Sequence, residues 1–167
     1  FEQNSRLKSI GENAFNNSEI EIISIPLNVA EIGNSVFKDC YLKKVEFEKN
    51  SSLNEIKSHV FCNISIEIIT IPSHITKICS FAFANCKSLK QICFSENSEL
   101  EIIEDYAFAG IGIREISIPL SVSEVGFEAF VDCHKLRQIF LDKKSSLKGY
   151  HFGITDANVS YIGENNK

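Results

Sequence analysis

Apolar residues recur along this chain in a fixed order that is repeated several times. The stretch SIPLNVAEIGNSVFKDC, residues 24–40, returns with changes at 70–86 and at 117–133. Looser versions carry Asn-Ser where these carry Ile-Pro, and they occupy 4–15, 50–61 and 97–108. Each unit contains a phenylalanine at the same place, and successive ones lie 22, 24, 22, 25 and 22 residues apart: Phe15, Phe37, Phe61, Phe83, Phe108 and Phe130. The chain is therefore an array of repeats, whose true period is a pair of units of about 46–47 residues.

Each unit contains a short stretch in which apolar and polar residues alternate. This period of two and the many β-branched residues favour a strand over the alternative, a pair of amphipathic helices per unit. Proline at 26, 72 and 119 should end its strand because it has no N–H to donate to a ladder. We expect six main parallel strands, centred near Ile23, Val45, Ile69, Ile92, Ile116 and Ile139.

A unit of this length cannot bury its own apolar side. Stacking of similar units joins those sides into one continuous core, so that each coil completes the core of its neighbour. The predicted fold is a β-rich solenoid with one main strand per coil. The part of each unit that carries G-x-x-A-F-x-x-C should turn on the other side of the coil, as a short turn, a 3₁₀ segment or a short helix.

The string I-P-x-x-V-x-x-I-G-x-x-A-F-x-x-C, followed by L-x-x-I-x-F, resembles the BspA-like leucine-rich repeats of surface proteins from mucosal bacteria and protozoan parasites. The resemblance covers about residues 4–148, and the alternating Asn-Ser units are more similar to the protozoan members. It implies a curved, right-handed leucine-rich repeat solenoid with its strands on the concave face, no enzymatic activity, and adhesion to host matrix or cells. The chain departs from the pattern where Lys57, Cys79 and Glu104 replace glycine, so these sites should not all need a positive φ.

The two ends of the array differ from its middle. We expect about six coils over residues 1–148, and a degenerate last repeat that caps the core over 149–167, because a terminal repeat must close the core against water. Phe152, Val159 and Tyr161 could supply one more phenylalanine position and one more strand. At the other end, Phe1 matches the residue that closes a strand, which predicts a truncated N-terminal end.

Composition narrows the possible partners. The net charge is −5 and the lysines and arginines form no block, which argues against nucleic acid and against anionic membrane surfaces. No apolar run approaches the ~18 residues of a membrane span, so we expect no direct membrane insertion by this segment. Protein is the expected partner, and the sequence does not define an oligomeric state.

The six cysteines are the first candidates for chemistry. Cys40, Cys86 and Cys133 share one column in alternate coils, which would place them ~9.5 Å apart, beyond the ~7 Å limit for a disulfide. The sequence has no C-x-x-C and no nucleophile or phosphate motif, and its histidines share no metal-ligand spacing. We expect free thiols, buried except at Cys93, and we assign no catalytic, cofactor-binding or metal-binding residue.

Function is therefore expected on the concave sheet face, where side chains that do not enter the core form rows. The predicted protein-binding residues are Ile22, Lys44, Glu46, Ile68, Thr70, Gln91, Cys93, Glu115, Gln138 and Phe140. The alternative, that these residues only solvate a sheet, does not account for the apolar Ile22, Ile68 and Phe140, which should be exposed.

The resemblance implies a cell-surface or secreted adhesin or antigen fragment that engages host proteins. The alternative is a cytoplasmic protein-interaction scaffold of the same fold. The sequons at Asn16, Asn50, Asn63 and Asn158 are permissive of secretion, whereas free thiols favour a reducing compartment.

Overall fold

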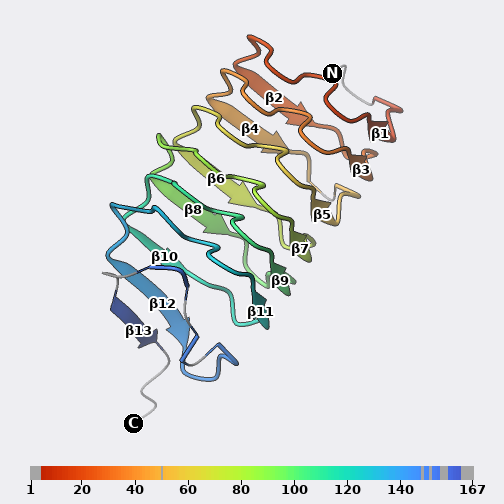
Figure 1. Ribbon diagram of the computed structural model, residues 1–167. Coiled ribbons are helices and arrows are strands. Elements are labelled where there is room, and N and C mark those ends of the chain that lie inside the picture. The colour runs from red at the N-terminus through yellow and green to blue at the C-terminus, as the bar shows by residue number, and fades with distance from the viewer. Residues whose placement is uncertain (1–4, 50, 148, 151, 155–157, 163–167) are drawn as a thin grey trace.

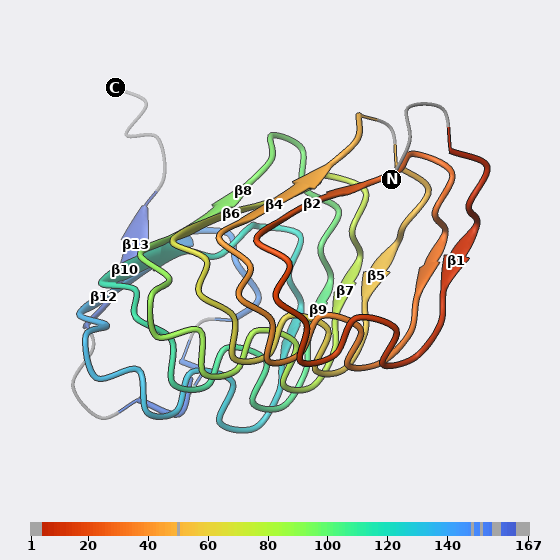
Figure 2. The same ribbon diagram turned by 90° about the horizontal axis from the view of Figure 1, so that it is seen from above.

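The structure, a computed structural model, describes residues 5–49, 51–147, 149–150, 152–154 and 158–162. These residues form thirteen strands and no helix, wound into a solenoid whose coils lie side by side (Figures 1 and 2). The longer strands are β2 (Ile22–Ile25), β4 (Lys44–Phe47), β6 (Ile68–Ile71), β8 (Gln91–Phe94), β10 (Glu115–Ser117), β12 (Gln138–Asp142) and β13 (Asn158–Ile162). We call the surface that they form the long-strand face. The six strands expected from the alternation are confirmed as β2, β4, β6, β8, β10 and β12.

A second row of strands, two residues each, was not predicted. It comprises β1 (Ser9–Ile10), β3 (Glu31–Ile32), β5 (Glu55–Ile56), β7 (Lys77–Ile78), β9 (Ile102–Ile103) and β11 (Glu124–Val125). All pair in parallel, and β5, β7, β9 and β11 form one continuous sheet. In each of these strands the second residue is buried, so the row closes the core on a second side.

Turns join the second row to the next long strand, so of the alternatives for this side the short turn is correct. Each turn has two positions with φ between 48° and 66°, occupied by Asn13 and Asn17, Ser35 and Asp39, His59 and Asn63, Phe81 and Asn85, Tyr106 and Gly110, and Glu128 and Asp132. Asn and Asp tolerate this left-handed conformation better than other non-glycine residues. As expected, Lys57, Cys79 and Glu104 are not among the positive-φ residues.

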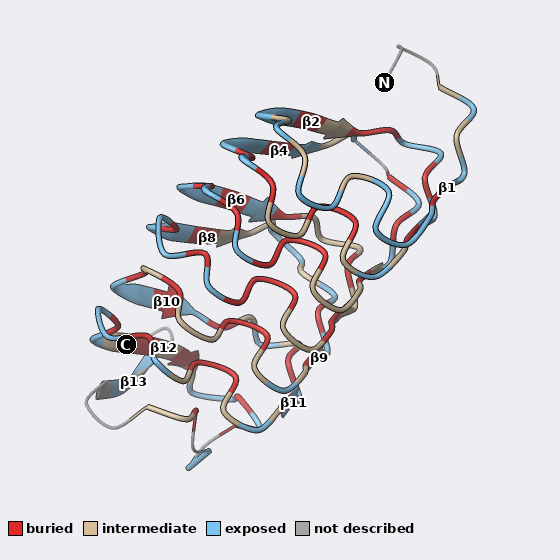
Figure 3. Ribbon diagram, turned by 45° about the horizontal axis from the view of Figure 1, so that its top comes forward, coloured by how far each residue is buried: buried red, intermediate tan, exposed pale blue. Residues whose placement is uncertain are grey.

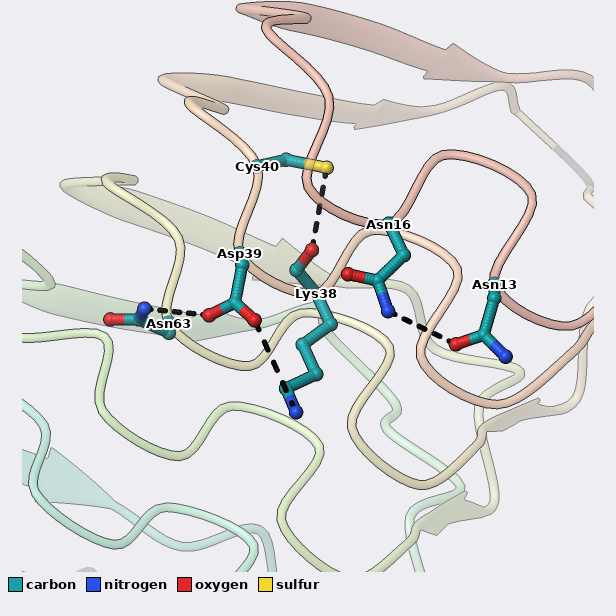
Figure 4. A network of polar contacts seen from close by, with 6 residues as sticks. All are labelled: Asn13, Asn16, Lys38, Asp39, Cys40 and Asn63. Atoms are coloured by element: carbon teal, nitrogen blue, oxygen red, sulfur yellow. Dashed lines mark hydrogen bonds and ion pairs between the residues drawn. The ribbon is translucent and has the colours of Figure 1, made fainter.

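The turns are also hydrogen-bonded from coil to coil. The N–H of Ser35 donates to the carbonyl of Ser58 at 3.0 Å, and the N–H of Phe37 donates to the carbonyl of Val60 at 3.0 Å. A side chain adds to this, because Asn63 donates to Asp39 of the preceding coil at 2.7 Å. Within the first turn, Asn16 donates to Asn13 at 3.1 Å (Figure 4). The left-handed residues therefore do more than reverse the chain, because they turn its amides toward the neighbouring coil.

The core is a set of columns that runs the length of the solenoid (Figure 3). Five phenylalanines, Phe37, Phe61, Phe83, Phe108 and Phe130, are fully buried. With Phe15 they form a continuous stack whose ring centroids lie 5.3–5.6 Å apart. Phe83 thus contacts Phe61 and Phe108, as expected from the repeat.

The long-strand face is interrupted, although the short-strand row opposite is continuous over four coils. Ladders join β2 to β4, β6 to β8, and β10 to β12 and β13, but none joins β4 to β6 or β8 to β10 (Figure 1). Within the pairs, the N–H of Glu48 donates to Ile25 and that of Ser95 donates to Ile71, both at 3.0 Å. At the breaks the same place in the repeat is held by Pro72 and Pro119, which have no N–H to donate to Phe47 and Phe94. Proline thus makes β6 and β10 behave as edge strands.

The last strand continues the array. β13 pairs in parallel with β12, so that Val159 lies beside Ile139 and Tyr161 beside Leu141. Phe152 is buried against Phe130 at 6.2 Å and extends the phenylalanine column. The boundary between 148 and 149 stays a prediction, and Phe1 lies outside the described residues.

Candidate functional site

The side chains predicted for binding lie in rows on the long-strand face. Seven of them are exposed: Ile22, Lys44, Glu46, Ile68, Thr70, Gln91 and Glu115. Their neighbours along each strand are buried, among them Ile23, Val45 and Ile69, so the predicted inside–outside register is confirmed. Strand pairing places Ile22 beside Lys44, and Ile68 beside Gln91.

Three of the predicted residues, Cys93, Gln138 and Phe140, are only half-buried. The prediction that Phe140 is exposed is wrong. Strand pairing places it between Ser117 of β10 and Ser160 of β13, so the ring has a neighbouring strand on each side. The extra strand was expected from Val159 and Tyr161, but its cover over Phe140 was not taken into account.

Several charges on and beside this face form ion pairs. Lys43 contacts Glu21 at 2.8 Å, Lys44 contacts Glu46 at 2.6 Å, and Lys90 contacts Glu67 at 2.8 Å. Ion pairs this exposed contribute at most about 1 kcal/mol each to stability. They therefore make the face polar but add little to the stability of the fold.

A groove of about 1230 Å³ opens on the long-strand face at the break between β4 and β6. Four of the predicted residues line it: Lys44, Glu46, Ile68 and Thr70. The groove also takes in residues that the sequence analysis did not single out, namely Phe47, Glu48, Lys49, Pro72, Ser73 and His74. The Nε2 atom of His74 is buried and has no hydrogen-bond partner among the described residues. The signal that could have located the groove is proline at the end of β6, together with the two extra residues between Phe47 and Leu53 compared with Ile25 and Val29.

The opposite, turn side carries a second surface feature that the sequence analysis missed. His59 stacks on Phe81 and Phe81 stacks on Tyr106, each with ring centroids 4.9 Å apart. Phe127 meets Tyr106 edge-on at 5.9 Å and is 64% exposed. Phe81 and Tyr106 hold left-handed backbone angles that are unusual for bulky residues. The rings of Phe81 and Tyr106 stack on each other, and this packing between neighbouring coils gives the row a structural role.

The cysteines behave as core residues. All six are free and only Cys93 is not buried. The thiols of Cys40, Cys86 and Cys133 donate to the carbonyls of Phe15, Phe61 and Phe108 in the preceding coil, at 2.9, 3.0 and 3.1 Å. Burial raises the pKa of Cys86 to about 12 and that of Cys133 to about 11, so neither is a thiolate at neutral pH.

The described residues contain no group of three or more His, Cys, Asp or Glu side chains placed to hold a metal ion. Within the same residues there is no helix of the length and apolar character needed to cross a bilayer. The chemistry that this arrangement supports is recognition by shape, backbone groups and scattered charges.

Solved structures of bacterial proteins share this architecture. The crystal structure of the pneumococcal vaccine antigen PcpA matches with a TM-score of 0.77 and 26% identity, over 83% of this chain and 36% of that one. A leucine-rich cell surface protein from Faecalibacterium prausnitzii is similar in fold, with a TM-score of 0.57 and 24% identity, over 83% of this chain and 43% of that one. The chain therefore spans less than half the length of either protein. None of the curated proteins compared with the chain matches it.

The repeat itself identifies the family. Residues 8–137 match six copies of the region described as the BspA type leucine-rich repeat. This span takes in the strands from β1 to β11 and the phenylalanine stack from Phe15 to Phe130. The chain belongs to the BspA type leucine-rich repeat family.

Proposed function

We propose that this chain is a non-enzymatic protein-binding module of a cell-surface or secreted protein, and that it engages host proteins through the long-strand face. The observation that carries the proposal is the exposure of apolar side chains on a face whose other exposed side chains are polar or charged. Ile22 is 65% exposed and Ile68 is 55% exposed, each at the first position of its strand. Extended faces of this kind are what solenoids use to bind partners.

Two similarities support the extracellular part of the proposal. PcpA is described as a vaccine antigen, and the protein from Faecalibacterium prausnitzii is described as a cell surface protein. Both are longer than this chain, so the activity of the whole protein to which these coils belong is part of the same proposal.

The test is binding of the purified chain to intact mucosal epithelial cells and to immobilised extracellular-matrix proteins. A variant with both Ile22→Asp and Ile68→Asp should lose at least about tenfold in affinity, because a buried charge without a partner is costly at an interface. Phe127→Asp is the matched control, since it alters an equally exposed apolar residue on the turn side and should bind as the wild type does. Equal binding by all three proteins, or none by the wild type, would contradict the proposal.

A second candidate is an intracellular interaction scaffold of the same fold. The six free cysteines favour it, because free thiols persist more readily in a reducing compartment. Antibody staining of intact and permeabilised cells of the source organism separates the two, since only a surface protein is stained without permeabilisation.

A further inference from the structure

A notch opens on the turn side where one short coil lies between two longer ones. In the short coil the buried column residues Ile111 and Ile113 have only Gly112 between them. The same two columns are separated by two residues in the coil before, 87–88, and in the coil after, 134–135. Over the short coil lies a hollow of about 510 Å³ that is lined from all three coils. This volume is within the roughly 300–1,000 Å³ of small-molecule sites.

The floor of the notch contains two glycines, so it is made of backbone. A Cβ on Gly112 would clash with the carbonyl oxygen of Lys87, so only glycine lets the short coil pack this closely against the coil before it. The N–H of Gly110 donates to Val131 at 2.8 Å, and that of Gly112 donates to Cys86 at 3.4 Å. These two amides are therefore already used, and the side chains around them must supply the polar contacts to a ligand.

Gly110 also interrupts a row of polar side chains. The same left-handed place in the other turns is held by asparagine or aspartate: Asn17, Asp39, Asn63, Asn85 and Asp132. Neighbours in this row can pair, as Asn63 does with Asp39 at 2.7 Å. At Gly110 no side chain stands between Asn85 and Asp132, which both line the notch. The side chain of Asn85 leans over the glycine, since its Oδ1 would lie 3.0 Å from a Cβ there.

The walls of the notch are positively charged, although the chain as a whole is acidic. Lys87 and Lys135 line it and are exposed, against the one carboxylate of Asp132. The formal charge of the lining is thus +1, whereas that of the chain is −5. None of these three side chains forms a hydrogen bond or an ion pair with another described residue. All three are therefore available to a ligand.

We infer that the notch binds an acidic sugar residue, whose carboxylate or sulfate group contacts Lys87 and Lys135 and whose hydroxyl groups bind Asn85 and Asp132. Ammonium groups form strong, charge-assisted hydrogen bonds with such anions. A hydroxyl group both donates and accepts, so it suits a carboxylate, which only accepts, and an amide, which does both. The inference goes beyond the proposed function, because none of the residues predicted for binding on the long-strand face lines the notch.

Other classes of ligand fit this lining less well. An inorganic anion would use the two lysines but would face the like charge of Asp132. A peptide would find the floor amides already bonded, and Ile111, the large apolar residue of the lining, is only 2% exposed. Nucleic acid requires a row of cationic groups along its backbone, whereas the lining offers two lysines.

The test is a titration of the isotope-labelled chain followed by NMR, in which the amides of Gly110 and Gly112 report from the floor of the notch. The probes are sialyllactose, which carries a carboxylate, and sulfated N-acetylglucosamine. Lactose and N-acetylglucosamine are their neutral controls, and inorganic sulfate is the anion alone. At about 0.15 M salt, at least one acidic sugar should bind at least about tenfold more tightly than its neutral control and than sulfate. The sugar that binds more tightly identifies the anionic group.

A variant that fills the notch tests its position. Gly110→Asn should fold normally, because asparagine holds the same left-handed place at Asn63 and Asn85. Its side chain would occupy the notch, so the affinity for the acidic sugar should fall at least about tenfold, with the amide of Gly112 as the reporter. Asn17→Gly is the matched control, since it makes the reverse exchange in a turn that does not line the notch, and it should bind as the wild type does.

A second variant tests the charge. Lys87→Gln combined with Lys135→Gln should lower the affinity for the acidic sugar to that for its neutral control. Lys49→Gln, at an exposed lysine outside the notch, should leave binding unchanged. The inference is overturned if neither acidic sugar shifts the floor amides, or if the neutral sugars or inorganic sulfate bind as tightly. Undiminished binding by Gly110→Asn or by the double lysine variant would overturn it as well.

Discussion

The phenylalanine column is the residue-scale feature on which the coils depend most. Each interior ring is buried and stacks on the ring before it and the ring after it, so one side chain serves two interfaces. Phe61 shows this well, since it lies 5.6 Å from Phe37 and 5.4 Å from Phe83. A vacancy in such a column cannot be closed by one neighbour without opening a gap to the other.

Phe83→Ala should lower the free energy of unfolding by about 3–5 kcal/mol, the usual range for truncating a large buried aromatic side chain. Because each coil is supported only by its neighbours, the loss should also separate unfolding into two transitions. Urea unfolding followed by circular dichroism and by hydrogen exchange measures both effects. Phe127→Ala, at an exposed ring, should stay within about 0.5 kcal/mol of the wild type. A Phe83→Ala protein as stable as that control would contradict the role of the column.

Because of the buried thiols, the free energy of unfolding should fall at alkaline pH. Burial raises the pKa of Cys86 from 9.0 to about 12, so above pH 9 the unfolded chain releases a proton that the folded chain retains. The contribution of this thiol is complete below about pH 9 and is lost as the pH rises toward 12.

We therefore expect the urea midpoint to fall between about pH 8 and about pH 10. Cys86→Ser keeps a hydroxyl that can donate to Phe61 but does not ionise in this range, so it should show a smaller fall. The same fall in both proteins would mean that other groups cause it.

At the scale of the element, the sequence predicts most of the features that depend only on residues within one coil. The alternation around Ile23 or Ile69 marks both the strand and its buried side, because it depends only on neighbours along the chain. The two-residue strands such as Lys77–Ile78 are too short to alternate, so their signal is absent. The break at Pro72 and the half-burial of Phe140 depend on which strands lie next to each other. Neither can be read from one coil alone.

The strand edges at the break should exchange their amide hydrogens faster than the paired edges do. The amides of Val45 and Phe47 face the break, whereas that of Glu46 faces β2, so protection should alternate along β4. Hydrogen exchange followed residue by residue by NMR measures this. In Pro72→Thr the amide at residue 72 should become protected. Uniform protection along β4 in the wild type would mean that a ladder closes the gap.

At the scale of the whole molecule, the building unit is a pair of coils. Each pair is joined by a complete long-strand ladder, and the breaks fall between pairs. The short-strand row, the turns and the phenylalanine column cross the breaks and hold the pairs together. An array of this kind should lose or gain whole pairs without a change of register.

Deletion of residues 48–94, 47 in all, joins Phe47 to Ser95 and removes one full pair, so the shortened chain should fold cooperatively with the remaining ladders intact. Deletion of residues 48–71 removes one coil and brings Pro72 to the position of Glu48. The donor to Ile25 is then lost, so the break should move to between β2 and β4, while Ser95 can donate to Phe47 and join β4 to β8. Hydrogen exchange followed by NMR compares the two proteins: the amide of Glu46, which faces β2, should lose its protection after deletion of 48–71 and keep it after deletion of 48–94. Equal protection of Glu46 in both would contradict the pair as the unit.

The hydrogen bonds of the turns have an electrostatic consequence for the whole solenoid. They run in one direction, from the N–H of Asn13 to the carbonyl of Asn34, from Ser35 to Ser58, from His59 to Ser80, and on through Phe81 and Tyr106. The amide dipoles of this strip therefore add along the solenoid axis, with the partial positive end toward the C-terminal coils. Glu128 and Asp132 hold the left-handed positions of the last of these turns, and the neutral Asn13 and Asn17 hold those of the first. The acidic side chains thus lie at the positive end of the strip, as acidic residues do at the start of an α-helix. In the solenoid this positive end is the C-terminal one, whereas in an α-helix it is the N-terminal one.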